Sequence, residues 1–162
     1  MNVTLSLNKM ASLIESGKYD EAVEIWSNTE NGTKKEGYRI VALNLSRHNK
    51  AGEHTELIKE YYNKSCHDQE YTRCVEYGKF LEKQKQYKEA EKIYLLLEKK
   101  HHDSESLERL YLLYRNPKWT GYDLDKSKYW WDKYFIVMEE RKEKSRIARK
   151  KYKLERFNKS NK

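Results

Sequence analysis

Apolar residues recur every three or four positions through most of this chain, which is the spacing of one face of an α-helix. The pattern predicts an all-α fold of eight helices, separated by turns such as those at Gly17 and Asn31-Gly32. The predicted helices span residues 4–16, 19–29, 36–48, 53–63, 68–84, 87–100, 104–115 and 124–138. We expect Ser104 to cap the seventh helix. The eighth can continue beyond residue 138, because no Gly or Pro follows Gly121.

One segment of the chain occurs twice. Residues 13–26 read LIESGKYDEAVEIW, and residues 81–94 read LEKQKQYKEAEKIY. The copies are 68 residues apart, or two periods of 34, a period found in arrays of paired helices. The small residues Ala22 and Ala90 are equivalent, and we expect the paired helices to approach closely there. The pattern therefore predicts an α-solenoid of about four antiparallel helix pairs.

Two of these pairs resemble known repeat families. The third is similar to a tetratricopeptide repeat at positions Tyr77, Gly78, Leu81, Tyr87, Ala90, Tyr94 and Leu97. The fourth is similar to a Sel1-like repeat, with its Gly-containing loop, Asp123, Lys126 and the pair Trp130-Trp131. The resemblance covers about residues 3–135. It implies a non-catalytic adaptor that holds a partner protein or peptide in a concave groove.

Carrying the repeat pattern across the chain gives an expected lining for that groove. The lining residues come from the first helix of the second, third and fourth pairs. They are Arg39, Ala42, Ser46, Thr72, Val75, Lys79, Glu82, Glu105, Glu108, Leu112 and Arg115. This mixed, polar lining suits a charged peptide. The other interpretation is an ordinary wet face without a ligand.

Charge is concentrated at the C-terminal end. Of 34 Lys/Arg and 26 Asp/Glu, residues 139–162 hold 11 and 4, so they carry +7 of the net +8. We therefore divide the chain into a repeat domain, 1–138, and a basic helix or tail, 139–162. The candidate polyanion-binding residues are Arg141, Lys142, Lys144, Arg146, Arg149, Lys150, Lys151 and Lys153. Nucleic-acid phosphates, acidic lipid and an acidic protein are the open alternatives, beside a purely solubilising or capping helix.

The aromatic pair Trp130-Trp131 has two interpretations. Adjacent helical residues point about 100° apart, so we expect one Trp in the core and the other at the surface or groove. A platform for stacking nucleic-acid bases is the alternative.

Other classes of site are not indicated. Cys66, His67 and Cys74 lack zinc-site spacing, and the two cysteines are expected to be buried thiols rather than a disulfide. His101-His102 is expected to stabilise a helix end. No catalytic triad or phosphate loop is evident, so we expect neither catalytic residues nor a cofactor.

The N-terminal residues do not read as a signal peptide, and no run of about eighteen apolar residues occurs, so we expect a cytoplasmic protein. The first functional hypothesis is an adaptor. Its rivals are a dedicated chaperone-like or immunity-like protein that masks one partner, a nucleic-acid-associated protein that uses the basic tail, and an enzyme.

Overall fold

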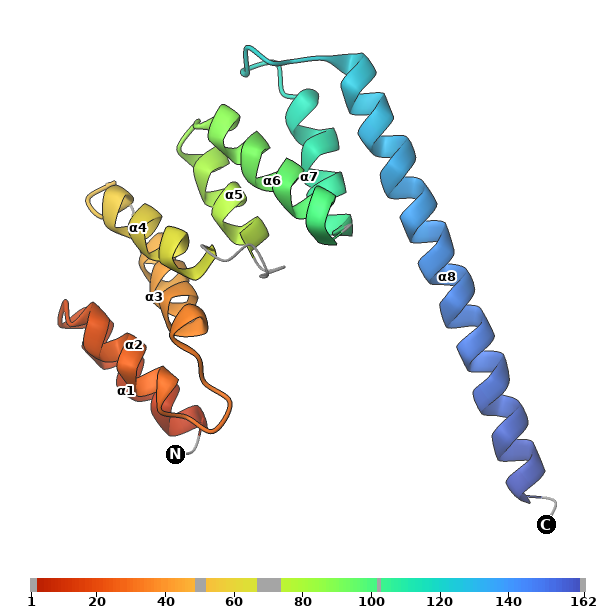
Figure 1. The fold of residues 1–162 in the computed structure, drawn as a ribbon, viewed down its shortest axis with the longest axis horizontal. Helices are drawn as coiled ribbons and strands as arrows, with labels where there is room; N and C mark the ends of the chain where they lie inside the picture. Colours follow the sequence, from red (N-terminus) through yellow and green to blue (C-terminus); the bar gives the residue numbers. More distant parts are fainter. Residues whose placement is uncertain (1–2, 49–51, 67–73, 102, 161–162) are drawn as a thin grey trace. The chain divides into compact units, whose positions relative to one another are not determined.

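The computed structural model describes residues 3–48, 52–66, 74–101 and 103–160, and over these residues it contains helices and no β-strand (Figure 1). The prediction of an all-α fold is therefore confirmed. The helices are α1 (Val3–Glu15), α2 (Tyr19–Ser27), α3 (Lys34–His48), α4 (Thr55–Cys66), α5 (Val75–Lys83), α6 (Tyr87–His101), α7 (Ser104–Tyr114) and α8 (Leu124–Ser160). None of these helices is long and apolar enough to cross a membrane.

The chain forms two compact units, Met1–His101 and His102–Lys162. The first holds α1 to α6 and the second holds α7 and α8. Helix α8 passes through residue 138 without a break, so this position separates neither two helices nor the two units. The last helix thus continues into the basic segment, which the lack of Gly and Pro after Gly121 predicts.

In the first unit, consecutive helices pack as pairs: α1 with α2, α3 with α4, and α5 with α6, while α2 also packs on α3. Gly17 lies in the turn between α1 and α2 and has a φ of 73°, a left-handed conformation that favours glycine. Burial of one face of each helix supplies the main stabilising term. The fully buried side chains include Met10, Ala22, Val23, Val41, Ala42, Ile58, Tyr62, Leu81, Ala90 and Tyr94.

Helices α5 and α6 are packed tightly at Gly78. A Cβ atom at this position would overlap the ring of Tyr94. Tyr94 is fully buried, and its hydroxyl donates a hydrogen bond of 2.6 Å to Glu82 Oε1 on α5. Gly78 therefore allows an aromatic ring to fill the space between the helices, as the small residue in the pattern predicts.

Ring packing and a disulfide connect α4 with α5 and its N-cap residue. The ring of Tyr62 stacks on Tyr77 with centroids 5.3 Å apart and planes 17° apart, and it meets Phe80 at 5.9 Å. Burial raises the pKa of Tyr62 to about 12, because the phenolate would lose its hydration. The second contact is a disulfide between Cys66 and Cys74.

The disulfide corrects the expectation of two unpaired thiols. Cys74 is buried, as expected, but its Cα lies 5.9 Å from that of Cys66, inside the range that a disulfide spans. The prediction was wrong because a separation of eight residues permits pairing or not, depending on how the chain returns.

In the second unit, α7 packs against the first part of α8. Buried Ser127 is the small residue at this contact, and its hydroxyl donates to the carbonyl of Tyr111 at 3.1 Å. Trp119, in the connecting loop, packs on Tyr114 with ring centroids 5.1 Å apart. Asp123 caps α8 by accepting a hydrogen bond of 2.9 Å from the backbone N–H of Lys126.

The cap of α7 differs from the prediction by one residue. Asp103, not Ser104, is the N-cap, and its carboxylate accepts from the backbone N–H of Ser106 at 2.7 Å. Ser104 is the first residue of the helix. Both residue types are good caps, and only the path of the backbone decides between adjacent candidates.

Candidate binding surfaces

Arg39 on α3, a predicted groove residue, forms internal ion pairs. Its guanidinium lies 2.7 Å from Glu36 Oε1 and 2.7 Å from Glu76 Oε2 on α5, and the side chain is 13% exposed. The hydrogen bonds with Glu36 and then Glu76 raise the pKa of Arg39 despite the opposing cost of burial. Arg39 thus links α3 to α5 and already has its carboxylate partners.

The other predicted groove residues of the first unit are largely part of its packing. Ala42 and Val75 are buried, so they belong to the core and not to an exposed lining, which corrects the prediction at these two positions. The Ser46 hydroxyl donates to the Leu43 carbonyl at 2.8 Å. Glu82 accepts the Tyr94 hydroxyl, Lys79 is half-buried on α5, and Thr72 lies outside the described residues.

The remaining four predicted groove residues belong to the second unit. Glu105 and Glu108 are half-buried on α7, whereas Leu112 and Arg115 are exposed at its C-terminal end. The predicted lining is therefore divided between the two units. Within the second unit, exposed Arg115 leads to a different feature.

A cleft of about 320 Å³ lies between α7 and α8. It is lined by Tyr111, Arg115, Leu124, Ser127, Lys128 and Trp131. The rings of Tyr111 and Trp131 pack with centroids 4.8 Å apart and form its aromatic wall. The Arg115 guanidinium lies 5.3 Å from the Tyr111 ring centroid and donates a hydrogen bond to the Tyr111 hydroxyl. The cleft therefore combines an aromatic surface with a positioned cation.

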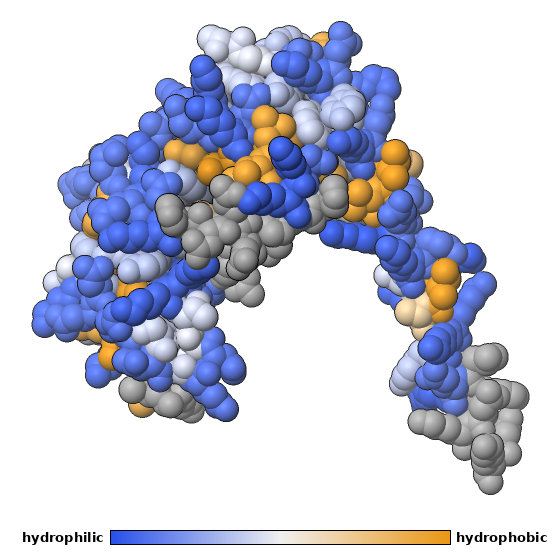
Figure 2. All heavy atoms as spheres, viewed as in Figure 1, coloured by the Kyte–Doolittle hydropathy of each residue, from blue (hydrophilic) through white to orange (hydrophobic). Residues whose placement is uncertain are grey.

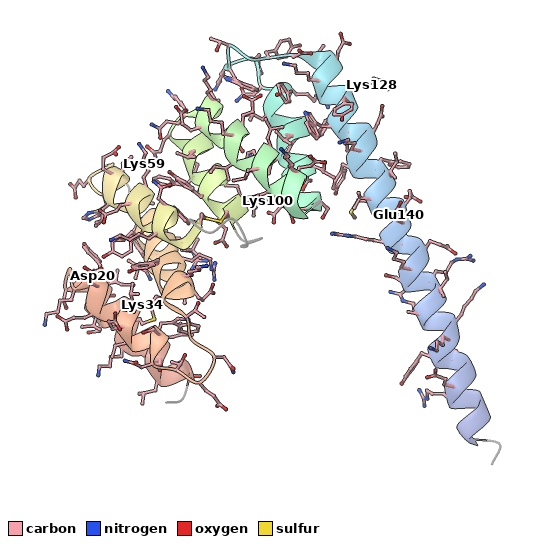
Figure 3. All side chains as sticks on the ribbon, viewed as in Figure 1. Asp20, Lys34, Lys59, Lys100, Lys128 and Glu140 are labelled. Atoms are coloured by element: carbon pink, nitrogen blue, oxygen red, sulfur yellow. A yellow bond between two sulfur atoms is a disulfide. The ribbon has the colours of Figure 1, made fainter. Side chains whose placement is uncertain are left out.

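The α8 side of this cleft continues as an exposed apolar strip. Leu124, Trp131 and Phe135 are all exposed, and their spacing places them on one side of the helix. Lys128 lies between them near the start of α8 (Figure 3), and its ammonium is 2.8 Å from Asp132 Oδ2. That hydrogen bond raises the pKa of Lys128.

Sequence reasoning located part of this surface. Trp130 is buried and Trp131 is exposed, as the 100° rotation between neighbours predicts. Arg115, a predicted groove residue, lines the cleft, whereas the predicted Leu112 is not among its lining residues. The cleft itself was missed, because neither Tyr111 nor Leu124 was among the predicted binding residues. The sequence did contain a signal for this surface. The apolar residues at positions 124, 131 and 135 share one side of the helix, whereas Ser127 and Trp130 are buried.

The predicted polyanion-binding residues lie on α8, and all eight are exposed. Six of them line one face together with Met138 and Ser145: Arg141, Lys142, Arg146, Arg149, Lys150 and Lys153. Lys144 and Lys151 project to the other side, since each residue turns the helix by about 100°. Figure 2 shows a mainly hydrophilic surface over the described distal part of this helix.

Over the described residues, no group of three or more His, Cys, Asp or Glu side chains is placed to hold a metal ion. His67 and His102 lie outside the described residues. A comparison of the chain with models of protein families, with curated proteins and with solved structures finds no match. The resemblance to tetratricopeptide and Sel1-like repeats therefore rests on the residues named above.

Proposed function

We propose that this chain is a non-catalytic protein-binding module that holds a segment of a partner protein in the cleft between α7 and α8. The observation that carries the proposal is the exposure of large apolar side chains beside cations. Leu124 is 56% exposed and Trp131 42%, and the adjacent Arg115 and Lys128 are exposed as well. Trp, Tyr and Arg are the residue types that most often dominate the energy of protein–protein contacts.

The chemistry of the cleft suggests what the bound segment contains. An apolar side chain of the partner would bury the exposed surface of Trp131 and Leu124, which is favourable in proportion to the area removed from water. Carboxylates beside that side chain would accept charge-assisted hydrogen bonds from Arg115 and Lys128. The preferred ligand is therefore a peptide segment with an apolar anchor and flanking acidic residues.

In this proposal the first unit is a scaffold of helical repeats of the tetratricopeptide type. Two observations support it. The equivalent residues Ala22 and Ala90 are both 0% exposed, which fits one packing position repeated along the chain. The helices α1 to α4 also contact one another in succession, which is how stacked repeats bury faces that a single pair leaves exposed.

The test compares binding by two variants with matched exposure. Leu124→Asp places a charge in the cleft at the first position of α8, where an acidic residue favours the helix dipole and should leave the fold intact. Ile147→Asp makes the same change on α8 outside the cleft, at a residue 55% exposed against 56% for Leu124. Affinity purification from the native host with quantitative mass spectrometry measures partner recovery.

We expect Leu124→Asp to reduce recovery of the specific partner at least about tenfold, the effect of losing about 1.4 kcal/mol, while Ile147→Asp retains it. Equal recovery with both variants would reject the cleft. One partner in fixed stoichiometry would favour the dedicated partner-masking protein, and several partners that depend on Leu124 would favour the adaptor.

A further inference from the structure

The distal part of α8 has no packing partner in its own unit over the described residues. Where it leaves α7, Arg141 Nη1 donates a hydrogen bond of 2.6 Å to Ser104 Oγ. Residues 141–153 are all exposed. Figure 3 places Glu140 near the middle of α8, and side chains extend from the helix beyond it. This segment adds little to the core, so its composition needs another physical explanation.

The proximal cations of the segment are balanced by carboxylates. Lys142 lies 2.6 Å from Glu139 Oε1, and Arg146 lies 2.7 Å from Glu143 Oε2, each one helical turn away. Such pairs stabilise an exposed helix by roughly 0.2–0.5 kcal/mol each. These pairs help to explain why the exposed segment is helical as far as Arg146.

The distal cations repel one another instead. Arg149 has Arg146 three residues before it and Lys153 four residues after it. Lys150 has Arg146 four residues before it and Lys153 three residues after it. No carboxylate of the described residues forms an ion pair with Arg149, Lys150 or Lys153. Like charges at these spacings destabilise a helix by about as much as opposite charges stabilise it. A bound polyanion would remove this repulsion, so charge complementarity identifies an anionic occupant.

The dimensions of the basic face suit duplex nucleic acid. Its six cations occupy residues 141–153, a length of about 18 Å at 1.5 Å per residue. A helix with side chains is about 10–12 Å across, which matches the major groove of about 12 Å, so cations on both flanks can reach phosphates.

We infer that the basic face of α8, formed by Arg141, Lys142, Arg146, Arg149, Lys150 and Lys153, binds the phosphate backbone of duplex nucleic acid without strong sequence preference. The contacts are from Lys and Arg to phosphates, which position a protein on a duplex and carry no sequence information. This surface is separate from the cleft of the proposed function, and either can fail without the other.

Two variants with the same change in charge test the inference in the full-length chain. Arg149→Gln/Lys153→Gln removes two cations from the basic face, and Lys144→Gln/Lys151→Gln removes two from the other side of the same helix. Gln has nearly the helix propensity of Lys and Arg, so both should fold alike, which circular dichroism verifies. The measurement is fluorescence anisotropy of a labelled 20-base-pair duplex of random sequence at several salt concentrations.

We expect the logarithm of the wild-type association constant to fall linearly with the logarithm of the salt concentration. Its slope should approach about −5 if all six cations contact phosphates, at about −0.9 per contact. Arg149→Gln/Lys153→Gln should reduce its magnitude by about 2, whereas Lys144→Gln/Lys151→Gln should change it little. Backbone hydrogen exchange in residues 141–153 should slow when the duplex binds, because the repulsion is relieved.

An equal loss of duplex affinity in the two variants would overturn the inference, because binding would then depend on the net charge of the chain and not on the basic face of α8. So would no duplex binding at low salt. Binding to phosphatidylserine vesicles or to polyglutamate, with none to the duplex, would assign the face to a membrane or to an acidic protein and would also overturn it.

Discussion

At the scale of single residues, Gly78 determines how closely α5 and α6 pack. The space that its missing Cβ leaves is filled by the buried ring of Tyr94, which its hydrogen bond to Glu82 holds in place. In an ordinary exposed helix, replacing Gly with Ala stabilises by about 0.5–1 kcal/mol. Here the added methyl group meets a ring that cannot easily move, so the sign should reverse.

We therefore expect Gly78→Ala to lower the free energy of unfolding by about 1–3 kcal/mol, the usual cost of overpacking a core. Urea denaturation followed by circular dichroism measures the change. The exposed Lys92→Ala on α6 is the control and should stay within about 0.5 kcal/mol of the wild type. A Gly78→Ala protein as stable as the wild type would show that the two helices are further apart than described.

Residue-level features were predictable where one residue type has one structural use. Gly17 at a tight turn and the fully buried Ala90 are examples, because a small residue in a helical pattern restricts what surrounds it. Arg39 was not predictable in this way. Its partner Glu76 lies 37 residues away, and a periodic pattern on one helix does not reveal a carboxylate on another.

At the scale of elements, helix positions followed from the 3.6-residue period, but the length of α8 did not follow from that period alone. The apolar pattern weakens near residue 138, whereas the helix extends to Ser160. Beyond the part of α8 that packs on α7, no Gly or Pro interrupts the helix, and ion pairs one turn apart stabilise it. The α4–α5 junction was the less predictable element, because its disulfide depends on how the chain returns on itself.

The disulfide between Cys66 and Cys74 affects the stability of the fold and depends on the redox state of the cellular compartment. A loop of this length constrains the unfolded chain enough to stabilise the fold by about 2–3 kcal/mol in the chain-entropy model. Disulfides persist mainly in oxidising compartments, so in the cytoplasm expected from the sequence the same residues would be thiols. The cytoplasmic location stays a prediction.

We expect Cys66→Ser/Cys74→Ser to lose about 2–3 kcal/mol relative to the oxidised protein. Dithiothreitol should destabilise the wild type by a similar amount and should leave this variant unchanged, which makes the variant its own control. Alkylation of the denatured but unreduced protein, followed by mass spectrometry, counts free thiols. Two labelled cysteines in protein purified under oxidising conditions would contradict the described pairing.

At the scale of the whole molecule, the chain consists of two compact units that divide the predicted groove lining between them. The repeat pattern assigns positions within one helix pair, but it does not say how successive pairs pack, so it could not locate a continuous surface. It also left Tyr111 out of the predicted binding residues, although this residue forms a wall of the α7–α8 cleft. Leu112 and Arg115, two of the predicted groove residues, are exposed, and Arg115 lines the cleft.

The most direct test of the central claim, that the α7–α8 cleft binds a partner protein, is site-specific photocrosslinking in the native host. A photoreactive amino acid replaces exposed Lys128 in the cleft or, as the control, exposed Lys144 on the same helix outside it. We predict a discrete crosslinked protein from position 128 and none of that protein from position 144. The same crosslinks from both positions, or none from position 128 while the partner still copurifies, would contradict the account.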